Sequence, residues 1–176
     1  MMKAVKKGDI DNVKLLLDQE SDPNFVDVWT AASSPLNLAS CDGHTDIVEL
    51  LLDRDADPNF VDRTGKTALM WASNRGHIDI VRLLLDRGVD PNIRTDNGYT
   101  ALMGAIGDSS RDTDIVRLLL DRGANPNIRT NTGYTALMLA INNGNTDIIT
   151  LLMRYMTTIR MQSLHRGKMT RRKLRT

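Results

Sequence analysis

Apolar residues gather in short runs along the chain, and the most regular of these runs is a leucine triplet. The triplets begin at Leu15, Leu50, Leu83 and Leu118, and Leu151-Leu152-Met153 follows as a fifth copy. Their starting points are 35, 33, 35 and 33 residues apart. A period near 33 residues predicts one structural unit repeated along a line, which is a stacked array without a single central core.

The clearest copy of the unit covers residues 62–94 and predicts two helices joined by turns. Thr67 has the position and hydroxyl of an N-cap, and Gly76 has the character of a left-handed helix end. A second helix is predicted over 78–86, with its buried stripe at Ile80, Val81, Leu84 and Leu85. Two short helices and a projecting turn cannot bury their apolar faces alone, so each unit needs neighbours.

The motifs of this copy resemble the ankyrin repeat. They are Gly65-Lys66-Thr67-Ala68-Leu69-Met70-Trp71-Ala72, Gly76, Ile80-Val81, Leu84-Leu85 and Gly88-Val89-Asp90-Pro91-Asn92. The opening recurs as Gly98-Tyr99-Thr100-Ala101-Leu102-Met103 and Gly133-Tyr134-Thr135-Ala136-Leu137-Met138. Met70, Met103 and Met138 stand where the family usually has histidine, so packing replaces a polar bridge to the loop. This Thr-Ala-Leu-Met variant is similar to ankyrin arrays encoded by giant DNA viruses.

The resemblance implies an all-α ankyrin repeat solenoid of about five helix-turn-helix repeats with projecting β-hairpin loops. We expect repeats near 1–26, 27–61, 62–94, 95–129 and 130–156, the first a truncated cap made polar by Lys3, Lys6 and Lys7. Beyond the array, residues 157–176 are predicted to be a basic helix extension and tail. The helix is expected to end at Gly167.

Two insertions interrupt the period. Asn24 to Ser34 spans ten residues where the other tips span eight, so the tip that carries Trp29 is longer. Trp29 is either an anchor for a partner or a side chain folded back onto its own hairpin. The segment 107–112 makes a longer turn between the helices of the fourth copy, and a tolerated surface insertion is the preferred interpretation.

Ankyrin arrays commonly bind protein partners through their hairpin tips and the exposed side of the first helices. The resemblance therefore implies a non-enzymatic protein–protein interaction module, although solvent-facing tips without a partner would look the same. The tip residues so assigned are Trp29, Ser33, Arg63, Thr64, Lys66, Asp96, Asn97, Tyr99, Asn131, Thr132 and Tyr134. The helix residues are Cys41, Asp42, Asn74, Arg75, Asp108, Asn142 and Asn143.

Charge divides the chain into two parts. Residues 1–156 carry 16 Lys and Arg against 22 Asp and Glu, a net charge of −6, whereas 157–176 carry seven cations and no acid, a net charge of +7. The tail residues are Arg166, Lys168, Arg171, Arg172, Lys173 and Arg175, with Arg160 upstream. Such a segment could bind nucleic acid or an anionic membrane, serve as a nuclear-import signal, or contact the acidic body itself. No aromatic residue follows Tyr155, which argues against base stacking.

Residues suited to catalysis do not cluster. The single cysteine, Cys41, has no cationic neighbour in sequence, and His44, His77 and His165 lie at least 33 residues apart. Gly65-Lys66-Thr67 lacks the earlier glycine of a phosphate-binding loop. We therefore expect no enzyme activity, metal or cofactor, and a monomer in a reducing intracellular compartment, cytoplasmic or nuclear, or the host cell if the protein is viral. The start of the chain lacks the features of a signal peptide, and no apolar run is long enough to span a membrane.

Overall fold

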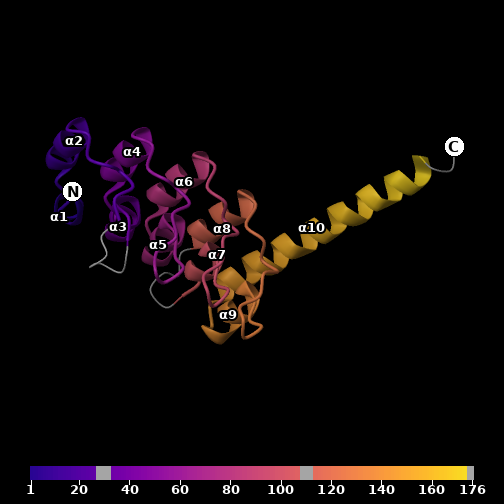
Figure 1. Cartoon of the computed structure of the whole chain (residues 1–176). Coiled ribbons are helices and arrows are strands. Elements are labelled where there is room, and N and C mark those ends of the chain that lie inside the picture. The colour runs from indigo at the N-terminus through magenta and orange to yellow at the C-terminus, as the bar shows by residue number, and fades with distance from the viewer. Residues whose placement is uncertain (27–32, 108–112, 174–176) are drawn as a thin grey trace.

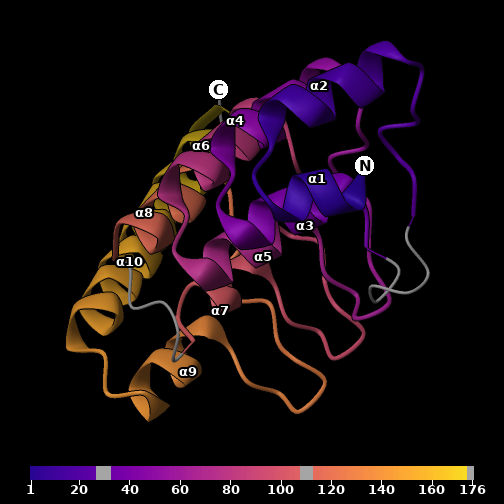
Figure 2. The same cartoon turned by 90° about the vertical axis from the view of Figure 1, so that its left-hand side faces the viewer.

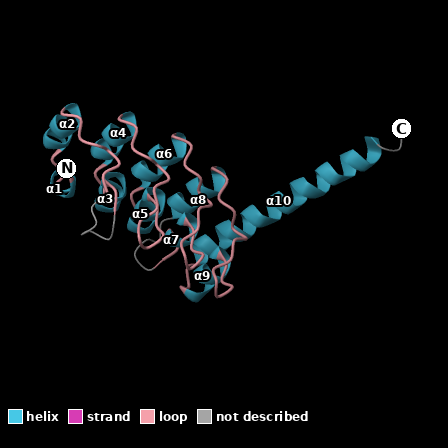
Figure 3. Cartoon of the chain, in the orientation of Figure 1, coloured by secondary structure: helices cyan, strands magenta, loops and turns pink. Residues whose placement is uncertain are grey.

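The computed structural model describes residues 1–26, 33–107 and 113–173, and their side chains as far as residue 159. Its helices form two parallel rows, and successive copies of the unit lie side by side (Figures 1 and 3). The inner row is α1 (Met2–Lys6), α3 (Pro35–Asp42), α5 (Ala68–Arg75), α7 (Ala101–Gly104) and α9 (Ala136–Asn142). The outer row is α2 (Ile10–Asp18), α4 (Thr45–Asp53), α6 (Ile78–Asp86), α8 (Thr113–Asp121) and α10 (Thr146–Lys173).

The inner helices α3, α5, α7 and α9 begin where a hydroxyl side chain caps them. Thr67 accepts a hydrogen bond from the backbone N–H of Met70, and Ser34, Thr100 and Thr135 do the same in their own copies. Such a cap satisfies one of the free N–H groups of the first turn and contributes about 1 kcal/mol. The predicted N-cap at Thr67 and the left-handed helix end at Gly76 (φ 82°) are both confirmed.

The core is a continuous strip between the two rows. The predicted stripe of α6, Ile80, Val81, Leu84 and Leu85, is buried, as are all four matching residues of α8. In α4, Ile47, Val48 and Leu51 are buried and Leu52 is partly buried. The core reaches Val5 in the first copy and Leu152 in the last, and each copy adds one layer to it. The all-α repeat solenoid predicted from the period is therefore confirmed.

Two ladders of polar contacts join successive copies on the surface. Arg54 pairs with Asp18 at 2.8 Å and Arg87 with Asp53 at 2.9 Å, and Arg122 and Asp86 continue the series. Such exposed pairs contribute about 0–1 kcal/mol each. In the second ladder, an asparagine side chain bonds to the backbone of the next copy. The side-chain amide of Asn92 donates to Gly123 O (3.1 Å), and the backbone N–H of Asn125 donates to Asn92 Oδ1 (2.8 Å).

The last outer helix differs from the sequence-based expectation. α10 continues through Gly167 to Lys173 without a break, so the predicted helix end at Gly167 is wrong. The helix leaves the array at its C-terminal end and projects beyond it (Figure 1). A glycine lowers helix stability by only about 1 kcal/mol, and the helix-forming residues on either side of Gly167 outweigh that cost here. Within the described residues, no helix combines the length and the apolar character needed to cross a membrane.

Candidate functional site: the inner groove between the third and fourth copies

The hairpin tips of the third, fourth and fifth copies are turns closed in the same way. The N–H of Asp62 donates to the carbonyl of Lys66 (3.0 Å), that of Thr95 to Tyr99 (2.9 Å), and that of Thr130 to Tyr134 (2.8 Å). Thr95 and Thr130 also accept the N–H of Tyr99 and Tyr134 through their hydroxyls, each at 3.0 Å. These three tips are tight turns and do not form regular strands. They form a row along one side of the array (Figure 2).

The third tip is held by a buried carboxylate instead of a threonine. One oxygen of Asp62 accepts hydrogen bonds from Thr64 Oγ1 (2.6 Å), Thr64 N (2.8 Å) and Lys66 N (3.0 Å). The other oxygen accepts the indole N–H of Trp71 at 2.9 Å. Lys66 Nζ lies 4.0 Å from the centroid of the Trp71 ring, a cation–π distance. These four residues thus connect the tip to α5 and set the position of the Lys66 ammonium group.

Asp62 keeps its charge in this setting. Burial raises the pKa of its carboxyl, but the hydrogen bonds from Thr64, Lys66 and Trp71 together outweigh burial, and the pKa lies below its ordinary value of 3.8. All four donors favour the ionised form, because a carboxylate accepts hydrogen bonds better than a carboxylic acid does. The tip therefore contains a permanent negative charge at neutral pH, fully satisfied by its neighbours.

Neighbouring tips are in direct contact. Gly65 has φ 75°, and a Cβ atom at this position would lie 2.8 Å from Asp96 N, so only glycine fits there. Asn131 donates from its side chain to Asp96 O (2.7 Å) and from its backbone to Asn97 O (3.0 Å). The tips are thus a fixed surface, with Tyr99 and Tyr134 exposed on it at equivalent positions.

A groove of about 310 Å³ lies where the third and fourth tips meet α5 and α7. We call it the inner groove. Met70 and Met103 form its apolar floor, and Tyr99 borders it from the fourth tip. Among the described residues that line it, Lys66 is the single charged side chain. These lining residues are Thr64, Lys66, Met70, Asn74, Thr95, Asn97, Tyr99, Thr100, Met103, Gly104 and Gly107.

Two glycines leave the inner groove open. Gly104 stands where the third copy has Trp71 and the fifth has Leu139, and Gly107 stands where they have Asn74 and Asn142. Neither glycine has a positive φ, and a Cβ atom would meet its nearest neighbour at 3.6 Å for Gly104 and 3.4 Å for Gly107, close to ordinary van der Waals contact. The backbone and the packing therefore leave room for a Cβ atom at both positions, and at Gly104, the last residue of α7, a side chain would also favour the helix.

Of the residues predicted to bind a partner, the structure brings five together in the inner groove: Thr64, Lys66, Asn74, Asn97 and Tyr99. Others are committed to internal contacts, since the Cys41 carbonyl lies 3.2 Å from His77 Nε2 and Asn143 donates to Ile106 O at 2.9 Å. Residues outside the groove are Ser33, Asp42, Arg63, Arg75, Asp96, Asn131, Thr132, Tyr134 and Asn142. Trp29 and Asp108 fall outside the described residues, as do the side chains of the basic tail.

Sequence reasoning missed the floor of the groove. Met70 and Met103 were treated as packing residues only, and Gly104 and Gly107 were not singled out. Comparing equivalent positions across the copies would have indicated the groove. Trp71, Gly104 and Leu139 differ far more in size than the neighbouring residues do.

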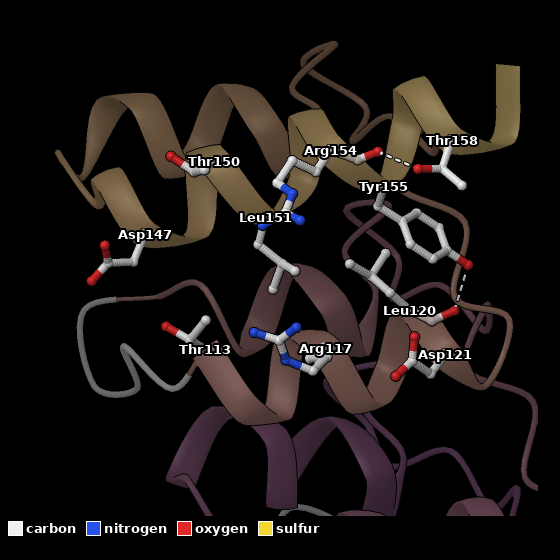
Figure 4. Close-up of a pocket in the computed structure, with 10 residues that line it drawn as sticks. All are labelled: Thr113, Arg117, Leu120, Asp121, Asp147, Thr150, Leu151, Arg154, Tyr155 and Thr158. Carbon is white, nitrogen blue, oxygen red and sulfur yellow. Dashed lines mark hydrogen bonds between the residues drawn. The ribbon is translucent and has the colours of Figure 1, made fainter. Parts of the chain in front are cut away.

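A second groove, of about 560 Å³, lies between α8 and α10 (Figure 4). Arg117 and Arg154 extend into it, and Asp121 and Asp147 stand at its sides. The hydroxyl of Tyr155 donates to Leu120 O at 2.6 Å, at the position where earlier copies carry the arginine of the ion-pair ladder. Among the described residues that line this groove, the two cations and the two anions cancel in net charge.

In the parts of the chain that the structure describes, no three His, Cys, Asp or Glu side chains are grouped so that they could hold a metal ion.

Comparison with known families agrees with the geometry. A family model described as ankyrin repeats (3 copies) matches residues 1–95 and 87–163. The chain therefore belongs to the ankyrin repeat family. Ankyrin repeats are generally protein–protein interaction modules, and the family is typically non-enzymatic. No curated protein matches the chain.

Proposed function

We propose that this chain binds a protein partner through its hairpin tips and inner helices, with the inner groove as the central contact. The proposal is supported by membership of a family of interaction modules and by the meeting of tips and helices at one opening. The surrounding array is rigid, because the tips and the helices are tied to neighbouring copies by hydrogen bonds. Preorganisation of this kind reduces the entropy that a partner's binding would cost.

The lining of the groove suggests which kind of segment it accepts. Met70 and Met103 offer an adaptable apolar floor, and methionine accommodates side chains of varied shape. Lys66 supplies a positive charge at the rim, and the amide of Asn97 can bond to a peptide backbone. Asn74 donates to Gly104 O at 3.5 Å and offers its amide oxygen as an acceptor. We infer that the partner inserts a bulky apolar side chain flanked by an acidic residue.

The observation that carries this proposal is the pair Gly104 and Gly107. At Gly104, the last residue of α7, glycine lowers helix stability by about 1 kcal/mol relative to alanine. At neither position does the backbone conformation or a contact of a Cβ atom require glycine. α7 is accordingly short, four residues against eight in α5. A stability cost without a structural need is typical of positions that serve binding.

The test is selection of binding peptides from a displayed random library on the full chain, followed by affinity measurement by calorimetry. Selected peptides should share a bulky apolar residue next to Asp or Glu. Gly104→Leu, which places the residue of the fifth copy in the groove, should weaken their binding by at least about tenfold, or ~1.4 kcal/mol. Lys66→Met should weaken it less, and the loss should shrink at high salt.

Arg63→Met is the matched control, because Arg63 is an exposed cation on the same tip that does not line the groove. The Arg63→Met variant should bind the selected peptides with the same affinity as the wild type. Peptides that bind Gly104→Leu as tightly as the wild type would contradict the role of the groove. Loss of binding in the Arg63 variant, with Lys66→Met unaffected, would place the contact on the outer edge of the tip instead.

Binding of nucleic acid or an anionic membrane through the basic tail stays a prediction. α10 carries this segment clear of the array, but the absence of aromatic residues after Tyr155 leaves only phosphate contacts to support it.

A further inference from the structure

The C-terminal end of the array exposes large apolar side chains. Met138 and Ile141 of α9 are 43% and 56% exposed, and Met153 of α10 is 55% exposed. We call these three residues the C-terminal end face. They lie on the last inner and outer helices, where the stacking of copies stops (Figure 1).

The same positions are buried inside the array. In the fourth copy, Met103 is 3% exposed, Ile106 1% and Leu120 1%, because α9 and α10 pack over them. The end face thus consists of stacking residues without a following layer. Exposed apolar patches of this kind mark surfaces at which proteins associate.

The opposite end of the array is built differently. α1 and α2 present the exposed lysines Lys3, Lys6 and Lys14 to solvent. Leu15 of α2 is exposed here as well (53%), so this end combines lysines with an apolar side chain. If the C-terminal end face of one chain stacked onto the N-terminal end of another chain, apolar residues would therefore lie against lysines.

The α10 extension, residues 157–173, projects past the end face. At 1.5 Å per residue its 17 residues span roughly 26 Å, which is the width of two to three helical layers at about 10 Å each. Residues 157–176 carry a net charge of +7, and residues 1–156 carry −6. A protein that stacks on the C-terminal end face would lie beside this cationic helix.

We propose that the C-terminal end face binds a second copy of this chain in a two-fold symmetric dimer. In such a dimer both chains use the same surface, so apolar residues meet apolar residues. Each basic extension then lies along the acidic array of the other chain. A stable interface buries about 1,200–2,000 Å² in total, more than three side chains per copy supply. The extension provides the additional area and the charge complementarity. This proposal is independent of the inner groove, and it replaces the monomer expected from the sequence.

The experiment is sedimentation velocity on the full chain over a range of concentrations. The wild type should sediment as a dimer at low ionic strength. Ile141→Lys should raise the dissociation constant at least about a hundredfold, because the charge would be buried twice per dimer. Met138→Lys should also raise the dissociation constant of the dimer. Leu15→Lys is the matched control at the opposite end, since Leu15 is 53% exposed, and it should leave the dimer intact.

The extension is tested in the same way. Arg171→Glu combined with Arg172→Glu should weaken the dimer, and so should about 1 M salt, where the Debye length falls to about 3 Å. Circular dichroism should show each variant to be as helical as the wild type, since the substituted end-face side chains are already exposed. A wild type that remains monomeric at every concentration, or a dimer that persists in Ile141→Lys, would overturn the proposal. Association seen only after addition of a DNA oligonucleotide would overturn it too and assign the extension to nucleic acid.

Discussion

The inner helices of the third and fourth copies, α5 and α7, begin alike and end differently. Both follow a threonine cap with Ala-Leu-Met, and both bury those residues in the same core. At the next position Trp71 stands in α5 and Gly104 in α7. The shared residues maintain stacking. Of the two differing residues, Gly104 lines the inner groove, whereas Trp71 lies outside its lining and donates to Asp62. Binding properties in such an array are therefore set where equivalent positions disagree.

The strongest test of the comparison asks whether the two copies share one core. Leu84 of α6 and Leu119 of α8 occupy equivalent positions, and both are fully buried. Leu84→Ala and Leu119→Ala should each lower the free energy of unfolding by about 2–5 kcal/mol, through lost burial and a residual cavity. Urea unfolding measures both. A loss below about 1 kcal/mol for Leu119→Ala alone would mean that the fourth copy is more loosely packed than the third.

The next largest effect concerns the contact between Asp62 and Trp71, which the fourth copy lacks because Thr95 and Gly104 stand at the equivalent positions. Asp62→Asn should lower the free energy of unfolding by about 1.5–3 kcal/mol, because a charged acceptor that serves Thr64, Lys66 and Trp71 becomes a neutral amide. Tryptophan fluorescence should change with it, since the indole loses a carboxylate partner. Thr95→Ser retains a hydroxyl at the equivalent position of the fourth tip and should cost far less. Equal losses in both variants would remove the distinction between the two tips.

The same carboxylate predicts a dependence on pH. Its pKa is lower in the folded chain than the ordinary value of 3.8, so ionised Asp62 stabilises the fold fully above that value. The stabilisation is lost as the pH falls through the lower, folded-state pKa. The difference in unfolding free energy between wild type and Asp62→Asn should therefore narrow below about pH 4. A difference that stays constant down to pH 2 would show that Asp62 does not titrate in this range.

The smallest effect is a gain in stability. Gly104→Ala should raise the free energy of unfolding by about 0.5–1 kcal/mol, since an alanine favours the helix and its Cβ atom has room. Gly88→Ala is the control, because space is open there but φ is 79°, and it should destabilise by about 1 kcal/mol or more. Thermal unfolding compares the two variants. A loss of stability in Gly104→Ala would show that the glycine is needed for the fold, and the case for a binding role would weaken.

The sequence predicted the repeated features well. The leucine period located every outer helix, and the Thr67 cap, the Gly76 helix end and the stripe of α6 follow from local chemistry that is the same in each copy. Prediction was weaker where one copy departs from the others. The link from Asp62 to Trp71 joins residues nine apart on two different elements, so neither helical spacing nor turn chemistry indicates it.

The site shows the same division. Lys66, Asn97 and Tyr99 were predicted from their place on the tips, and the structure gathers them at one opening. Met70 and Gly104 belong to two successive inner helices, and their contribution to a single groove depends on how closely those helices stack. The end of α10 was misjudged because a helix end depends on the balance of a whole segment, and Gly167 alone does not decide it.

The sequence by itself determined the family, the all-α array, the helix caps and the division into an acidic body and a basic end, because each rests on local periodicity or charge. Only the tertiary structure decided that Lys66 lies over Trp71, that Gly104 and Gly107 open a groove beside Met70, and that Met138, Ile141 and Met153 remain exposed at the end of the stack. The reason is physical. Exposure and cavities are properties of the space between neighbouring copies, and that space exists only once the copies are stacked.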